Sequence, residues 1–140
     1  MSVPIHYVDA FTDKLFSGNP AAVIFSDIND ENLMQKIAAE NNLSETAFIR
    51  NDSRNYHIRW FAPLCEIDLC GHATLASAYI YFKYINPESS QFKVQSLKNG
   101  VLKVTKKDDL LILDFPKDSL NKYDDKKFIE KIVNSKVIDL

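Results

Sequence analysis

Residues 71–84 constrain the fold more than any other segment, because they read as a helix without a polar stripe. Apolar or small side chains fall on every side of that helix: Ala73, Leu75, Ala76, Ala78, Tyr79, Ile80 and Phe82. A helix that is apolar all round is buried all round. The small residues in its early turns also allow other backbones to pack close to it. We therefore expect it to be the central helix of the domain.

Strand-like segments lie on both sides of this helix. Their expected ranges are 5–11, 21–25, 45–50, 56–61, 91–96, 101–105 and 110–115. Asp30 can cap an earlier, amphipathic helix, and residues 128–133 form another amphipathic stretch. Turn signals at 17–20 and 99–100 separate strands. The predicted class is α+β, with six or so strands, mostly antiparallel, around one buried helix.

Composition excludes several classes of protein. The 140 residues carry a formal net charge of −2 and are 46% hydrophobic, which is ordinary for a globular domain and argues against nucleic acid as the main partner. The sequence contains no window of 18 apolar residues, so we expect no membrane partner, and its first residues do not resemble a signal peptide. Cys65 and Cys70 fit neither a CxxC motif nor a zinc knuckle. We expect a cytoplasmic protein with reduced thiols.

Known cofactor and metal motifs do not account for any segment. The sequence holds no GxGxxG, P-loop or GxSxG pattern. His6, His57 and His72 lie on separate expected elements, without the spacing of metal ligands. The residues therefore predict no metal site.

Two clusters before the central helix could carry chemistry. Residues 16–23 read as a loop that turns sharply into a strand. In the second cluster, a strand that begins at Glu45 places this carboxylate on the same face as Ala47 and Ile49. Desolvation on an apolar face raises the pKa of a carboxyl group, which suits a group that takes and returns a proton. The alternative is an exposed glutamate at the mouth of a strand.

The third cluster spans residues 59–76 and leads into the central helix. The first N–H groups of a helix lack internal partners, so with the helix dipole they can bind an anion such as a carboxylate. Gly71 would let a ligand approach this backbone, and His72 could donate a hydrogen bond or transfer a proton. Cys70 beside the helix start would have a lowered pKa. The alternatives are a capped helix, a core histidine with its partners and an inert buried cysteine.

Together, the three clusters resemble the N-terminal half of the PhzF family of phenazine biosynthesis-like proteins. The matching segments are FSGNPAAV at 16–23, LSETAF at 43–48, RWFAP at 59–63 and EIDLCGHATLA at 66–76. The resemblance implies a diaminopimelate epimerase-like fold, in which each of two α+β domains wraps a mostly antiparallel, barrel-like sheet round one central helix. It assigns residues 1–116 to the N-terminal domain, and residues 117–140 to a charged connector or the start of a missing second domain.

The resemblance also implies a function. It predicts an isomerase that moves a proton between carbons of a small carboxylic acid, with neither metal nor cofactor. Glu45 matches the family's general acid/base and His72 a substrate-positioning histidine. Further positions that match substrate-binding residues are Gly71, Ala73, Asn19 and Ser44. Cys70 falls where epimerase relatives carry a catalytic thiol, so it is a candidate second base; the alternative is a small, tightly packed residue.

The second half of the family's active site is not in this sequence. Three explanations stay open: a natural half, a fragment, or two copies that complete each other's cleft. Because a half-domain exposes the apolar surface that would face its partner, we expect a homodimer. The alternative function is that of a non-catalytic half-domain, a binding or interaction module.

Overall fold

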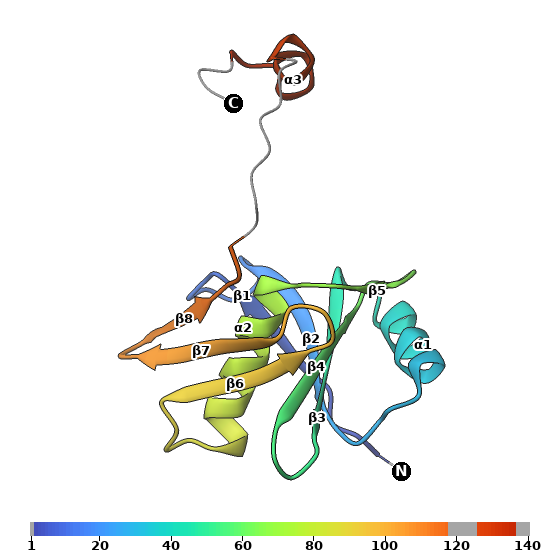
Figure 1. Ribbon diagram of the computed structural model, residues 1–140, viewed down its shortest axis with the longest axis vertical. Helices are drawn as coiled ribbons and strands as arrows, with labels where there is room; N and C mark the ends of the chain where they lie inside the picture. Colours follow the sequence, from blue (N-terminus) through green and yellow to red (C-terminus); the bar gives the residue numbers. More distant parts are fainter. Residues whose placement is uncertain (1, 118–125, 137–140) are drawn as a thin grey trace.

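A curled sheet wraps one helix in the computed structural model, which describes residues 2–117 and 126–136. The strands are β1 (His6–Ala10), β2 (Asn19–Phe25), β3 (Glu45–Asn51), β4 (Tyr56–Phe61), β5 (Glu66–Ile67), β6 (Gln91–Ser96), β7 (Val101–Lys107) and β8 (Leu110–Asp114). The helices are α1 (Glu31–Asn41), α2 (Gly71–Ile80) and α3 (Lys126–Val133), and the π-helical turn η1 (Tyr81–Ile85) continues α2. Figure 1 shows α2 inside the curl of the sheet and α1 outside it.

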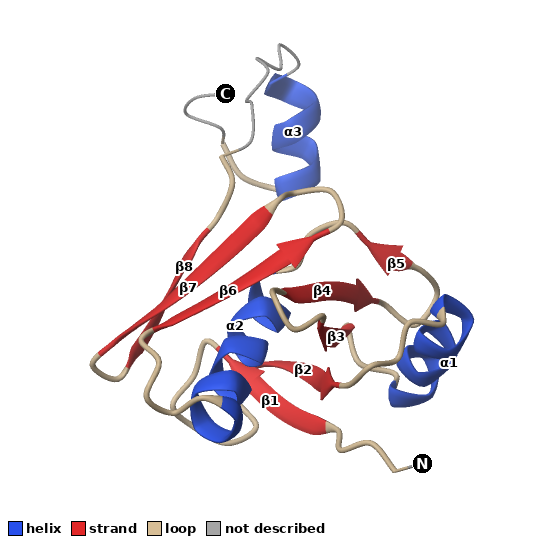
Figure 2. Cartoon of the chain, turned by 60° about the horizontal axis from the view of Figure 1, so that its bottom comes forward, coloured by secondary structure: helices blue, strands red, loops and turns tan. Residues whose placement is uncertain are grey.

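The sheet is mixed but mostly antiparallel, as predicted. Its order is β1-β2-β3-β4-β6-β7-β8, with β5 paired to β4. The pairs β2·β3 and β4·β6 are parallel, and the other five pairs are antiparallel. Figure 2 shows β1–β4 and β6–β8 on different sides of α2, so that the sheet forms a half-barrel. The expected fold class is confirmed, although eight strands form where six or so were expected.

The central helix is buried along its first turns and emerges at its far end. Ala73, Ala76 and Ala78 are fully or almost fully buried against the sheet. The hydroxyl of Ser77 donates to the Ala73 carbonyl at 2.7 Å, so this polar group also has a partner in the core. Tyr79, however, is 43% exposed. The prediction of burial all round was therefore wrong for the last turns, because an open half-barrel does not enclose the whole helix.

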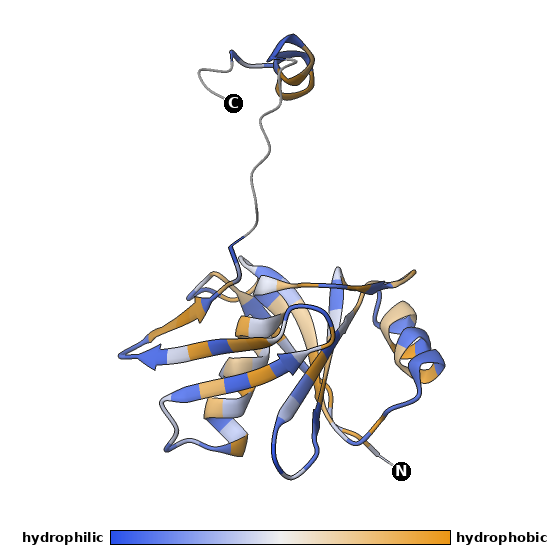
Figure 3. Cartoon of the chain, viewed as in Figure 1, coloured by the Kyte–Doolittle hydropathy of each residue, from blue (hydrophilic) through white to orange (hydrophobic). Residues whose placement is uncertain are grey.

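A second, smaller core lies on the other side of the sheet. Met34 and Ala38 of α1 pack there with Phe48 and Phe61. The predicted cap is confirmed, since the Asp30 carboxylate accepts from the N–H groups of Asn32 and Leu33. The β3–β4 connection, by contrast, is hydrophilic and coloured blue in Figure 3. Apolar groups thus cover both faces of β3.

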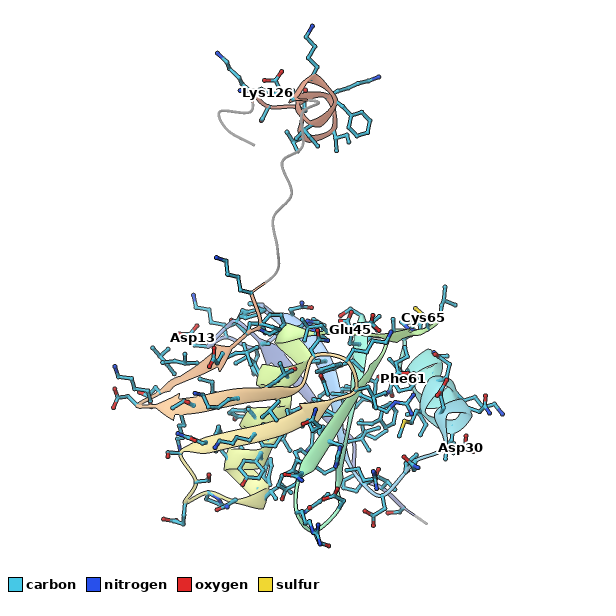
Figure 4. The ribbon with its side chains drawn as sticks, viewed as in Figure 1. Asp13, Asp30, Glu45, Phe61, Cys65 and Lys126 are labelled. Carbon is cyan, nitrogen blue, oxygen red and sulfur yellow. The ribbon has the colours of Figure 1, made fainter. Side chains whose placement is uncertain are left out.

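Strand register gathers several chain turns at one end of the domain. Ala21 pairs with Glu45 in the parallel pair β2·β3, so both strands begin there. Thr46 pairs with Phe61, so β4 ends there. Figure 4 accordingly shows the labelled residues Asp13, Glu45 and Cys65 along the same end of the body. We call this the site end, because α2 also begins there.

Candidate active site

Three side chains from β3 and the start of α2 meet at the site end. Glu45 Oε2 lies 3.1 Å from His72 Nε2, and Cys70 Sγ lies 3.4 Å from His72 Nδ1. The His72 ring therefore presents one nitrogen to each neighbour. Glu45 is the first residue of β3 and shares a face with the buried Ala47, which directs its side chain toward α2. The structure thus brings together the acid and the helix start that the sequence analysis singled out.

Two buried polar atoms in this cluster lack hydrogen-bond partners among the described residues. The side chains of His72 and Glu45 are only 10% and 18% exposed. Although His72 Nε2 and Glu45 Oε2 are within ion-pair distance, neither atom forms a hydrogen bond. A buried polar group left unsatisfied costs about 1–3 kcal/mol, so such groups call for an explanation. A bound substrate that accepts from one atom and offers a hydrogen to the other would satisfy both.

The beginning of α2 supplies backbone donors beside these atoms. Cys70 is the N-cap, and its side chain makes no capping hydrogen bond. No acidic residue lies in the first turn. The first-turn N–H groups, from Gly71 to Ala73, and the positive end of the helix dipole therefore form a place for an anion. The Glu45 and His72 atoms next to it, which lack hydrogen-bond partners, also indicate that a ligand binds here.

Gly71 is not required by the fold itself. A Cβ placed there would meet the Phe115 ring at 3.6 Å and Leu113 at 3.9 Å, which are ordinary contacts. Its backbone is not in the left-handed region. Phe115 and Leu113 thus form a wall beside the start of α2. The sequence patterns predicted no role for Phe115, although the residue lies in the LDFP segment that ends β8.

Asn19 and Ser44 lie at the site end but outside the cluster. Both are exposed, at or just before the first residues of β2 and β3. The Ser44 hydroxyl donates to the Pro20 carbonyl at 3.4 Å. Neither side chain has a hydrogen bond to Glu45, Cys70 or His72 within the described residues. Their predicted role in lining a cleft stays a prediction.

The prediction of an acidic Cys70 was wrong. Burial raises the pKa of the Cys70 thiol from 9.0 to about 11, and the nearby Glu45 carboxylate adds to this rise. The backbone N–H groups of Ala73 and His72 act in the opposite direction but are outweighed. Desolvation therefore exceeds the effect of the helix start, and Cys70 is protonated at neutral pH.

Alkylation should separate the two cysteines. Cys65 is exposed and Cys70 is buried. Since the thiolate is the reactive form, we expect iodoacetamide at pH 8 to modify Cys65 at least about tenfold faster than Cys70. Peptide mass spectrometry over time would measure both rates. Equal rates would contradict the burial and raised pKa of the Cys70 thiol.

Cys70 should also make stability depend on pH at alkaline values. Because the folded-state pKa of about 11 exceeds the ordinary 9.0, the folded protein holds this proton more tightly than the unfolded chain does. Below pH 9 the thiol is protonated in both states and stability does not depend on its titration; the free energy of unfolding should then fall as pH rises from 9 to 11. Urea unfolding across this range should show a smaller fall in Cys70→Ser; an identical fall in both proteins would contradict the assignment.

The same cluster is the one group of potential metal ligands among residues 2–117 and 126–136. The ligand atoms of Glu45, Cys70 and His72 lie within 4.8 Å of one another. However, His72 presents Nε2 to Glu45 and Nδ1 to Cys70. One ion could not bind all three groups unless the ring turned, so the geometry fits a chain of polar contacts better than a metal site.

Arg59 and Glu66 belong to a structural network instead. The Arg59 guanidinium donates two hydrogen bonds of 2.6 Å to Glu66 and one of 2.8 Å to Glu31. The Glu66 carboxylate raises the pKa of Arg59 above its ordinary value. This bidentate pair holds the two-residue strand β5 to β4. Arg59 and Glu66, which belong to the third cluster, thus stabilise the fold.

In the part of the chain that the structure describes, no helix has the length and apolar content needed to cross a membrane.

Comparisons with known proteins agree with this fold. A family model described as "Phenazine biosynthesis-like protein" matches residues 8–134. A Pseudomonas aeruginosa protein named as an uncharacterized isomerase is 47% identical over 118 residues, which are 83% of this chain and 44% of the relative. This chain therefore spans less than half the length of that relative.

Two solved structures extend the comparison. A PhzF-family protein from Enterococcus faecalis superposes with a TM-score of 0.89 at 43% identity, over 99% of this chain and 54% of that protein. A predicted epimerase from Pseudomonas aeruginosa superposes with a TM-score of 0.65 at 20% identity, over 79% of this chain and 41% of that protein. The second likeness shows a shared epimerase-like fold.

Proposed function

The chain belongs to the phenazine biosynthesis-like family, and we propose that it acts as an isomerase that moves a proton between carbons of a small carboxylic acid. The observation that carries this proposal is the pair of buried atoms, Glu45 Oε2 and His72 Nε2, that lack hydrogen-bond partners beside the uncapped start of α2. A relative named as an isomerase supports the reaction class.

The proposed reaction uses the chain's own groups as follows. The first-turn N–H groups of α2 bind the substrate carboxylate, and His72 donates to a substrate oxygen. The Glu45 carboxylate takes a proton from one carbon and becomes a carboxylic acid, while the electron pair moves through an adjacent π-system of the substrate. Glu45 then returns the proton to another carbon. Protons and electrons balance without an added reactant.

Proton return of this kind requires a site that excludes water. Exposed apolar residues lie in the loops that follow β1, β4 and β6 at the site end, and we call them the apolar rim: Phe11, Leu15, Phe16, Leu64 and Leu97. Phe16 and Leu64 are 95% and 93% exposed. Large exposed apolar residues gathered around a site mark a contact surface. We propose that a second copy of this chain covers the rim in solution and completes the cleft.

A charged substitution in the rim should prevent this pairing. We expect the chain to sediment at twice its monomer mass and Phe16→Asp to sediment as a monomer, because a carboxylate in an apolar interface would be desolvated. Leu110→Asp is a matched control. Leu110 is also exposed, but it is the first residue of β8, at the end of this strand that lies away from the site end. A monomeric parent protein in analytical ultracentrifugation would contradict the pairing.

Deuterium uptake tests the reaction itself. The protein would be incubated in D₂O with a panel of small cyclic and α-amino carboxylic acids, and exchange at carbon would be followed by NMR. We expect uptake with at least one acid. Saturable binding of an acid without uptake would instead favour a binding module.

A further inference from the structure

The contact between Cys70 and His72 bears on which ring nitrogen of His72 carries the hydrogen. Cys70 Sγ and His72 Nδ1 are 3.4 Å apart and buried. A neutral imidazole carries one hydrogen, on either Nδ1 or Nε2, and the partner of one nitrogen decides which. Among the described residues, Cys70 is the hydrogen-bond partner of Nδ1, and Nε2 has none. The Cys70 contact is therefore the hydrogen bond through which the protein can select the tautomer.

The direction of the Cys70–His72 hydrogen bond follows from the state of the thiol. Burial and the nearby Glu45 carboxylate keep the Cys70 thiol protonated at neutral pH. A protonated thiol is a weak donor through S–H and a weak acceptor through sulfur. The Glu45 carboxylate oxygen, 3.1 Å from His72 Nε2, favours the ring hydrogen on that nitrogen, which leaves the thiol as the donor to Nδ1. When the S–H group donates to Nδ1, that nitrogen must carry a lone pair. The ring hydrogen then resides on Nε2.

We propose that Cys70 is a positioning residue, which holds His72 as the Nε2–H tautomer so that this N–H group faces the space beside Glu45 Oε2. A hydrogen-bond donor and a proton acceptor then lie 3.1 Å apart, and neither is used up by the fold. The donor can bind a substrate oxygen while the acceptor removes a proton from carbon. This use of the N–H group rests on the proposed function; the choice of tautomer does not.

A competing arrangement uses the same atoms. A hydrogen bond with the Glu45 side chain also contributes to the raised pKa of the Cys70 thiol, so the thiol could donate to the carboxylate instead. In that case removal of the thiol would leave the His72 tautomer unchanged. The two arrangements therefore differ in one measurable property, the response of the His72 ring to substitution of Cys70.

Nitrogen NMR on the full chain can read this property without a substrate. With ¹⁵N-histidine, the shifts of the two ring nitrogens and their couplings to the ring carbon-bound protons show which nitrogen carries the hydrogen. His6→Gln and His57→Gln assign the remaining signals to His72. We expect the Nε2–H tautomer in the parent protein and in Cys70→Ser, whose hydroxyl can still donate.

In Cys70→Ala the ratio of the tautomers should shift by about five- to tenfold, the factor that one neutral hydrogen bond sets. Cys65→Ser is the matched control, and its His72 signals should not move because Cys65 is exposed. An Nδ1–H tautomer in the parent protein, or an unchanged ratio in a folded Cys70→Ala, would overturn the proposal. Saturable binding of an acid without deuterium uptake would reject the isomerase function and leave this result standing.

Discussion

Replacing Glu45 with glutamine should lower deuterium uptake by a factor of about 10²–10⁴, which is the usual contribution of a general acid/base. Glutamine has nearly the same shape, but its amide cannot take a proton from carbon at neutral pH. The side chain would keep its place beside His72 Nε2, which lies 3.1 Å from the carboxylate oxygen in the structure. Binding of the acid should therefore persist while exchange is lost.

The test of Glu45→Gln must distinguish a loss of exchange activity from a loss of folded protein. Exchange at carbon by NMR would be compared with thermal unfolding of the same sample. Glu40→Gln is the matched control, because Glu40 is an exposed carboxylate on α1. We expect it to exchange like the parent protein. If Glu45→Gln kept its exchange rate within about threefold, Glu45 would not be the acid/base, since loss of such a group costs far more.

Much of the sheet could be predicted because local patterns matched the final environment. The predicted bounds of β4 and β6 are those observed, since alternating side chains there face a core on one side. β5 was missed, because two residues carry no periodicity and are held by the cross-strand Arg59–Glu66 pair. The end of α2 was also missed, because its exposure depends on how far the sheet curls.

The site was predictable in its members but not in its electrostatics. Strand phase and helix start made Glu45 and His72 candidates, the family resemblance supplied their roles, and the structure places them 3.1 Å apart. The pKa of Cys70 could not be predicted in the same way. It depends on a balance between helix N–H groups and burial, and burial is known only once the chain is folded. For the same reason sequence alone could not separate the structural Arg59 from the site.

Substitution by alanine should destabilise the fold at Gly18 but not at Gly71. A Cβ at Gly18 would overlap the Ala10 carbonyl oxygen and lie 2.6 Å from Thr12 Cγ2. The Ala10 backbone is fixed by its pairing with Asn19, so it cannot give way easily. Gly18→Ala should therefore lower the free energy of unfolding by about 1–3 kcal/mol, the usual cost of overpacking.

At Gly71 the fold leaves room for a methyl group, since the nearest contact of an added Cβ is 3.6 Å. Gly71→Ala should unfold within about 0.5 kcal/mol of the parent protein, as substitutions without steric conflict do. The added Cβ would nevertheless stand between the first turn of α2 and Phe115, where the substrate carboxylate is proposed to bind. Deuterium uptake should fall by about tenfold or more, because small displacements of a reacting group are costly.

Urea unfolding and exchange on both variants would distinguish the two roles of glycine. A destabilised Gly71→Ala would mean that the fold needs this residue, and its loss of exchange would then say nothing about the carboxylate site. A stable Gly71→Ala with normal exchange would contradict binding at the start of α2, because a Cβ cannot be added there without narrowing the approach between the helix and the Phe115 ring. Only unchanged stability together with lost exchange supports a glycine that is kept open for the substrate.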